Sequence, residues 1–87
     1  MKVWILFTDI IYNGETIRSN AEAHETKESA LIAFNDIVNS ERESATMDRW
    51  EIETDEECTF EAYEDGYYAT NHTYVTIEEQ EVINLTK

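Results

Sequence analysis

The fold is decided largely by residues 3–14, which read VWILFTDIIYNG. The stretch Val3–Tyr12 is rich in β-branched and aromatic side chains, which favour a strand. Asn13 and Gly14 follow it, and this pair is typical of a two-residue hairpin turn, because both turn positions need a positive φ. The segment therefore predicts a β-hairpin whose second strand runs from about residue 15 to residue 23.

A two-residue turn also predicts how the two strands pair. It places Tyr12 opposite Glu15, and the same register sets Asp9 opposite Arg18. Opposite charges on facing residues of neighbouring strands stabilise a sheet modestly. We therefore expect Asp9 and Arg18 to form a cross-strand charge pair.

The first strand is apolar on both of its faces, whereas a strand that is buried on one side should alternate with polar residues. One face carries Trp4, Leu6, Ile10 and Tyr12, and the other carries Val3, Ile5, Phe7 and Ile11. A single helix covers only one face of a sheet. Either the region of residues 67–74 covers the second face within the chain, or this face contacts another protein.

The next segment has helical spacing. Thr26 is a suitable N-cap, and Glu28 in the first turn suits the positive end of the helix dipole. The helix is expected to end near residues 43–45. Its apolar stripe consists of Ala30, Leu31, Phe34, Ile37 and Val38.

Beyond the helix the pattern returns to strands. Apolar and polar residues alternate over residues 50–53 and 58–63, Asp65-Gly66 gives a second hairpin signal, and residues 73–77 and 82–85 have strand-like composition. The segment 55–57 is either a turn or a charged strand. The sequence thus predicts one α+β domain over residues 1–87. Its antiparallel sheet has four to five strands with one helix packed on one face, in the order ββαβββ or similar.

Composition restricts the class of protein. The 87 residues carry 20 acids and 6 Lys or Arg, a net charge of -14, and 41% of them are hydrophobic, too many for a disordered acidic tail. Such charge disfavours direct binding to nucleic acid or to anionic membranes. The longest apolar stretch, residues 3–7, is far shorter than the ~20 residues that span a bilayer. A single cysteine, Cys58, fits a reducing compartment, and with no secretory signal a cytoplasmic protein is expected.

The acids are concentrated in one segment. Residues 48–65 contain nine acids and one base, Arg49. If residues 51–55 are extended, Glu51, Glu53 and Asp55 project from one face about 6.6 Å apart, which is close to the spacing of every second phosphate along a DNA strand. This row either imitates a phosphate backbone towards a basic partner, or is a solvated surface, or binds cations weakly. The candidate partner-binding residues are Glu51, Glu53, Asp55, Glu56, Glu57, Glu61, Glu64 and Asp65, with Tyr67 and Tyr68 as neighbouring aromatic anchors.

Catalytic and metal-binding patterns are not found in the sequence. No stretch has the ligand spacing of an EF-hand, and His24, Cys58 and His72 share no metal-ligand spacing. Both glycines are assigned to turns, so no glycine-rich phosphate loop is expected. We expect a protein that is not an enzyme and that has no cofactor and no built metal site.

In general character the chain resembles small acidic proteins encoded by phages and other mobile elements of bacteria. The resemblance rests on its size, on the order hairpin, helix, sheet, and on the stretch EDGYYATNHTYVTIEEQEV, residues 64–82. It covers no family-specific motif, so no functional residue is carried over. This broad group includes anti-CRISPR and anti-restriction proteins that imitate DNA, and the resemblance implies an inhibitor of host defence.

Together these observations predict a non-enzymatic acidic binding protein that occupies a basic, nucleic-acid-binding surface of another protein. A nuclease complex of bacterial defence fits this class of partner best. The alternative is a structural or assembly protein that forms a homodimer through the second face of the first strand.

Overall fold

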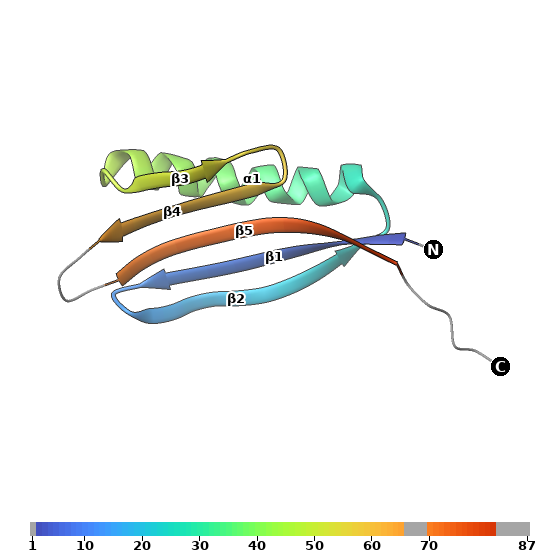
Figure 1. The fold of residues 1–87 in the computed structure, drawn as a ribbon, viewed down its shortest axis with the longest axis horizontal. Coiled ribbons are helices and arrows are strands. Elements are labelled where there is room, and N and C mark those ends of the chain that lie inside the picture. Colours follow the sequence, from blue (N-terminus) through green and yellow to red (C-terminus); the bar gives the residue numbers. More distant parts are fainter. Residues whose placement is uncertain (1, 66–69, 82–87) are drawn as a thin grey trace.

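A computed structural model describes residues 2–65 and 70–81 of the chain. The five strands form one antiparallel sheet in the order β2-β1-β5-β4-β3, with α1 packed on one face (Figure 1). This confirms the predicted α+β class and the order ββαβββ. The expected strand at residues 82–85 and the residues Gly66, Tyr67 and Tyr68 lie outside the described part. The elements are β1 (Lys2–Tyr12), β2 (Glu15–His24), α1 (Lys27–Met47), β3 (Glu51–Asp55), β4 (Thr59–Asp65) and β5 (Thr70–Glu81).

The β1–β2 hairpin turns where the sequence predicts. Asn13 has a φ of 54° and Gly14 a φ of 79°, and Tyr12 pairs with Glu15. A β-bulge then shifts the register, because β2 has one extra residue between the partners of Ile10 and Ile11. Asp9 consequently lies opposite Ser19, so the predicted pairing of Asp9 with Arg18 is wrong.

α1 begins where the sequence places its N-cap. The backbone N–H of Ser29 donates a hydrogen bond to Thr26 Oγ1 at 3.1 Å, which satisfies one of the free donors of the first turn. The helix ends at Met47, later than predicted, because the buried Ala45 keeps its last turn against the core. Arg49 then adopts a φ of 60°, and the N–H of Trp50 donates to the carbonyl of Ala45 at 2.8 Å.

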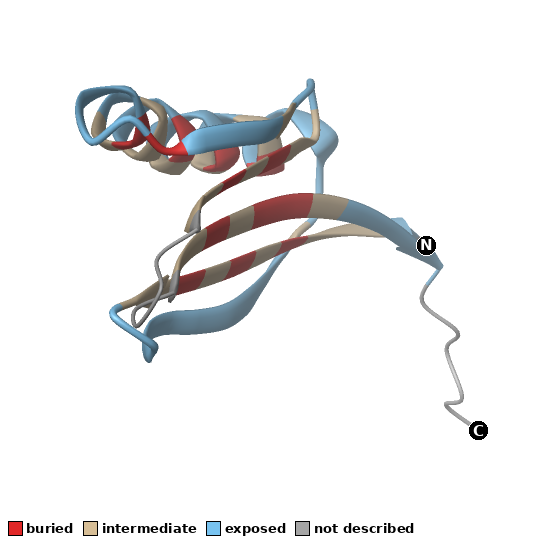
Figure 2. Cartoon of the chain, turned by 60° about the vertical axis from the view of Figure 1, so that its left-hand side comes forward, coloured by how far each residue is buried: buried red, intermediate tan, exposed pale blue. Residues whose placement is uncertain are grey.

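The core lies between α1 and the sheet. Phe34 and Val38 of the helix pack against Leu6 of β1, Phe60 of β4 and Val75 of β5, and each of these side chains is 1% exposed or less. Buried and less buried residues alternate along the three central strands, whereas β2 is exposed along almost its whole length (Figure 2). The helix therefore leaves this edge strand uncovered.

Polar groups also join the helix to the sheet. Glu41 Oε2 accepts hydrogen bonds from the Tyr12 hydroxyl at 3.2 Å and from Thr73 Oγ1 at 3.3 Å. Burial raises the pKa of Tyr12 above its usual value, and the neighbouring carboxylate of Glu41 raises it further. These bonds satisfy polar side chains at the margin of an otherwise apolar interface.

The second face of β1 is not covered by any other segment within residues 2–65 and 70–81. Residues 70–74 belong to β5, which pairs with β1 in the plane of the sheet, so this part of the expected cover does not fold behind β1, and residues 67–69 lie outside the described part. Since side chains alternate along a strand, the residues that point away from α1 form one surface. We call this surface the open face. It comprises Val3, Ile5, Phe7, Asp9 and Ile11 of β1, Thr16, Ser19, Ala21 and Ala23 of β2, Glu51 and Thr54 of β3, Thr59, Glu61 and Tyr63 of β4, and His72, Tyr74, Thr76, Glu78 and Gln80 of β5.

Candidate partner-binding surface

The predicted row of carboxylates on β3 is broken by a second β-bulge. Glu51 pairs with Tyr63, whereas Asp55 pairs with Phe60, and the register shifts between Ile52 and Thr54. Because Phe60 faces the helix and Tyr63 faces the other way, Glu51 and Asp55 lie on opposite sides of the sheet. The expectation that Glu51, Glu53 and Asp55 share one face is therefore wrong.

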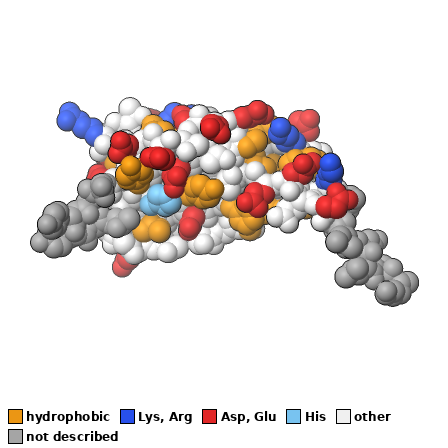
Figure 3. Space-filling view, viewed as in Figure 1, with side chains coloured by type: hydrophobic (Ala, Val, Ile, Leu, Met, Phe, Trp, Pro, Cys, Tyr) orange, Lys and Arg blue, Asp and Glu red, His pale blue; other side chains and the backbone are white. Residues whose placement is uncertain are grey.

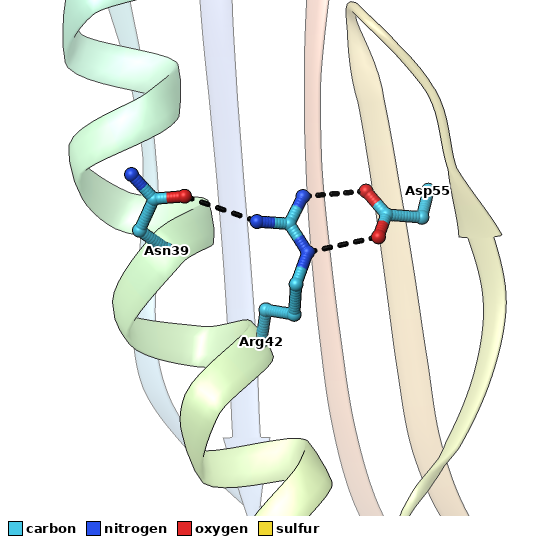
Figure 4. A network of polar contacts seen from close by, with 3 residues as sticks. All are labelled: Asn39, Arg42 and Asp55. Carbon is cyan, nitrogen blue, oxygen red and sulfur yellow. Dashed lines mark hydrogen bonds and ion pairs between the residues drawn. The ribbon is translucent and has the colours of Figure 1, made fainter.

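Asp55 is held by a bidentate ion pair rather than presented to a partner. Arg42 of α1 donates from Nε to Asp55 Oδ2 at 2.8 Å and from Nη2 to Oδ1 at 2.6 Å, and its Nη1 donates to Asn39 Oδ1 at 3.0 Å (Figure 4). The guanidinium also lies 5.6 Å from the centre of the Phe60 ring. The hydrogen bonds from Arg42 lower the pKa of Asp55. The pair thus ties the edge strand β3 to the helix.

We expect Asp55→Asn to destabilise the fold at pH 7 by about 0.5–1 kcal/mol, because both partners are partly exposed to solvent. Since the pKa of Asp55 is lower in the folded state, this contribution is present above the pKa of the unfolded carboxyl, about 3.9, and is lost as the pH falls through the folded value. Urea unfolding at a series of pH values measures the difference in free energy of unfolding between the unmodified protein and the variant. This difference should shrink towards pH 3, whereas the difference for Glu53→Gln, on the same strand, should not change with pH in this way. A difference that is constant with pH would contradict this account.

The other predicted acids are distributed over two surfaces. Asp55 ends β3, and residues 56–58 form the turn, in which the N–H of Glu56 donates to the carbonyl of Thr59 at 2.8 Å. The segment 55–57 is thus divided, because Asp55 belongs to the strand and Glu56 and Glu57 belong to the turn. Glu57 lies 3.7 Å from Lys27. Glu51 Oε2 accepts a hydrogen bond from the Tyr63 hydroxyl at 3.1 Å. Four exposed acids lie at this margin of the sheet, and we call them the acidic edge: Glu51, Glu53, Glu56 and Glu57.

The remaining predicted residues lie away from the acidic edge. Glu61 lies on the open face, where its Oε2 is 2.7 Å from His72 Nε2. Glu64 accepts a hydrogen bond from Asn71 Nδ2 at 3.3 Å. The Asp65 side chain and the residues Tyr67 and Tyr68 lie outside the described residues. The structure thus brings together four of the ten predicted residues on the acidic edge.

The net charge of -14 predicts that salt stabilises the fold. Raising sodium chloride from about 0.01 M to about 0.15 M shortens the Debye length from roughly 30 Å to 8 Å and screens repulsion among the carboxylates. A gain of about 1 kcal/mol would raise the melting temperature by ~4–8 °C for a domain of this size. Calorimetry in the two buffers measures this shift. An unchanged or lower melting temperature would mean that local partners already compensate the acids.

The open face carries a feature that sequence reasoning missed. A hollow of about 510 Å³ lies between β2, β1 and β5, lined by Phe7, Asp9, Ser19, Ala21, Tyr74 and Glu78 among others. The ring of Tyr74 stacks on His72, with centroids 6.4 Å apart and planes 9° from parallel. The only signal in the sequence is the apolar character of Val3, Ile5 and Phe7, because the sequence does not indicate that β5 is the second neighbour of β1.

Charge on the open face is of one sign. Asp9, Glu51, Glu61 and Glu78 contribute carboxylates, and no residue of this surface is a lysine or arginine. In the space-filling view, hydrophobic and acidic side chains are interspersed, a histidine lies among them, and the visible lysines and arginines lie towards the upper edge and the ends (Figure 3). The surface therefore combines apolar side chains with carboxylates.

Other kinds of site receive no support from the structure. Within residues 2–65 and 70–81, no group of three or more His, Cys, Asp and Glu side chains is placed to hold a metal ion. No helix in this part of the chain has the length and apolar character needed to cross a bilayer.

No family model matches the chain, and it has no significant match among curated proteins or solved structures.

Proposed function

We propose that the protein is a non-enzymatic inhibitor that acts in the cytoplasm and occupies a basic, nucleic-acid-binding surface of a bacterial defence nuclease. The observation that supports this most directly is the acidic edge on a hairpin that is fixed to the helix. Four exposed carboxylates lie along β3 and its turn, and Arg42 holds the strand through Asp55. A rigid array loses less entropy on binding than a disordered acidic tail.

The proposed role of Asp55 differs from that of its neighbours. Its carboxylate is used within the protein, whereas Glu53 and Glu56 project from the edge strand and its turn. A groove that binds a phosphate backbone presents lysine and arginine side chains, which attract such carboxylates at long range. The inhibitor then excludes the nucleic acid by occupying the same groove, and it needs no contact with the nucleic acid itself.

The proposal is tested by DNA cleavage with a panel of purified CRISPR nucleases and restriction endonucleases. At least one nuclease should be inhibited at low salt, by competition with its DNA, and inhibition should weaken as salt rises. Electrophoresis with DNA alone should show no complex. If every nuclease retains full activity at low salt with the inhibitor in excess, the proposed function is wrong.

A second candidate, an assembly protein that forms a homodimer, is favoured by one observation. Val3, Ile5, Phe7 and Ile11 lie on the open face, and no described segment covers them. However, two copies joined through this face would bring Asp9, Glu61 and Glu78 towards the same carboxylates of the second copy. Light scattering at physiological salt separates the two candidates: a single-chain mass supports the inhibitor, and a dimer that Phe7→Asp converts to a single chain supports assembly.

A further inference from the structure

The hollow on the open face has an ordered lining that follows from strand pairing. Phe7 of β1 lies between Ala21 of β2 and Thr76 of β5. One step along, Asp9 lies between Ser19 and Tyr74. Because the side chains on β2 are small and Phe7 and Tyr74 are large, the surface is hollowed between them. The lining is thus apolar in its centre.

Carboxylates lie at the two ends of this hollow. Asp9 pairs with Tyr74, and Glu78 is four residues further along β5. Four residues of an extended strand span about 13 Å, so the backbone positions of the two acids are separated by roughly this distance along the strands. Between them lies Phe7. The order along the hollow is therefore acidic, apolar, acidic.

This order specifies the chemistry of an occupant. A guanidinium or ammonium group pairs with each carboxylate, and a guanidinium also stacks on an aromatic ring such as that of Tyr74. An apolar side chain between the two cations would contact Phe7 and remove it from water. In an extended segment, side chains at positions i, i+2 and i+4 point to one side and span about 13 Å.

The position of Tyr74 is supported by its neighbours. Its ring stacks on His72, and His72 Nε2 lies 2.7 Å from Glu61 Oε2. His72 thus stacks on the Tyr74 ring, and Tyr74 also lines the hollow. An ordered ring at one end reduces the entropy that is lost when a cation stacks on it.

Charge complementarity distinguishes this occupant from the others. A nucleic acid or a second copy of the chain would bring negative charge to Asp9 and Glu78, and the open face has no lysine or arginine to compensate it. An acidic or purely apolar partner would leave these two carboxylates unpaired. Of these occupants, only a segment that is both basic and apolar pairs with the carboxylates and also covers the apolar side chains.

We propose that the hollow binds an extended segment of the partner protein in which two arginine or lysine side chains, at positions i and i+4, flank an apolar side chain at i+2. This inference rests on the proposed function and extends it, since it adds a second contact surface to the acidic edge. The basic residues contact Asp9 and Glu78, and the apolar residue contacts Phe7. The acidic edge attracts the partner, and the hollow then binds only a partner segment whose side chains have this spacing.

The test uses two blocked peptides of identical composition, RSLSR and RRLSS. Titration of the isotope-labelled protein with each peptide, followed by amide NMR shifts, should show RSLSR binding more tightly and shifting residues of β1, β2 and β5 around the hollow. Equal binding of both peptides would overturn the inference, because net charge alone would then account for the attraction.

Two variants separate the hollow from general electrostatics. Ala21→Leu places a larger side chain in the hollow and leaves every charge in place, and Ala21 is exposed, so the core is unaffected. It should abolish the preference for RSLSR. The double variant Asp9→Asn, Glu78→Gln should weaken RSLSR about two- to fivefold for each carboxylate removed. The matched control Glu22→Gln, Glu25→Gln removes the same charge elsewhere and should leave the preference intact.

The outcomes also separate this inference from the proposed function. If a nuclease is inhibited but the peptide shifts map to the acidic edge and Ala21→Leu has no effect, the hollow is not a binding site and the proposed function stands. If RSLSR binds at the hollow and no nuclease is inhibited, the site is supported and the proposed class of partner is wrong.

Discussion

Replacing Glu53, Glu56 and Glu57 together with lysine is expected to abolish inhibition of the target nuclease. The three side chains belong to the acidic edge, and each replacement changes the charge by two, so the net charge moves from -14 to -8. The basic groove of the partner would then face lysines at the point of closest approach. Loss of electrostatic steering lowers association rate constants about 10- to 1,000-fold. Repulsion between like charges in contact also destabilises the complex.

The control for this variant changes the same charge at the opposite edge of the sheet. Glu15, Glu22 and Glu25 lie on β2 or directly after it and are exposed, and β2 is the strand furthest from β3. Their replacement with lysine also gives a net charge of -8 and should weaken inhibition only slightly. Surface plasmon resonance at several salt concentrations measures both variants. Equal losses would show that total charge matters rather than its location, and full inhibition by the first variant would refute the acidic edge as the contact.

Replacing Phe34 with alanine is expected to produce the largest loss of stability. Its side chain is 1% exposed and lies at the centre of the core between α1 and the sheet. Removing a buried phenylalanine costs about 3–5 kcal/mol. A domain of this length has a free energy of unfolding of roughly 4–13 kcal/mol, so the variant loses a large part of it. Urea unfolding followed by circular dichroism measures the change.

Ile32 provides the matched control on the same helix. It is 66% exposed, so Ile32→Ala removes apolar atoms that are already in contact with water. The expected change is within about 0.5 kcal/mol, the usual range for surface substitutions. If the two variants were equally destabilised, the packing of α1 against the sheet as described would be wrong.

Much of the fold follows from local signals in the sequence. Asn13-Gly14 specifies the turn because its dihedral angles suit few other pairs, and Thr26 specifies the start of the helix because its hydroxyl accepts from Ser29. The periodic apolar residues of α1 specify which side is buried. Each of these signals acts over a few residues, so it is visible without knowledge of the rest of the chain.

The two bulges were not predictable in this way. Each adds one residue to an edge strand, β2 or β3, and reverses the faces of the residues beyond it. The ion pair of Arg42 with Asp55 joins elements that are adjacent only after folding. The composition shows that the segment is acidic. It does not determine the register of β3 on β4, which decides the side of the sheet on which Asp55 lies.

The hollow depends on an even longer-range relation. Phe7 and Thr76 are neighbours because β1 pairs with β5, which lies nearly at the other end of the chain. The apolar second face of β1 indicates that another group contacts it. However, Glu78 and the stacked Tyr74 are neighbours of that face only because β5 pairs with β1. The sequence therefore indicates the unusual apolar face of β1 but not the hollow beside it.

The uncovered edge of β2 has a consequence for how the protein behaves at high concentration. Ten residues of backbone end the sheet there without proline, so a second molecule has a template on which to add a strand and start a polymer. The surplus of carboxylates keeps approaching molecules apart. The charge on which the proposed recognition depends thus also opposes fibre growth, and a variant with a net charge near zero is expected to lose this protection.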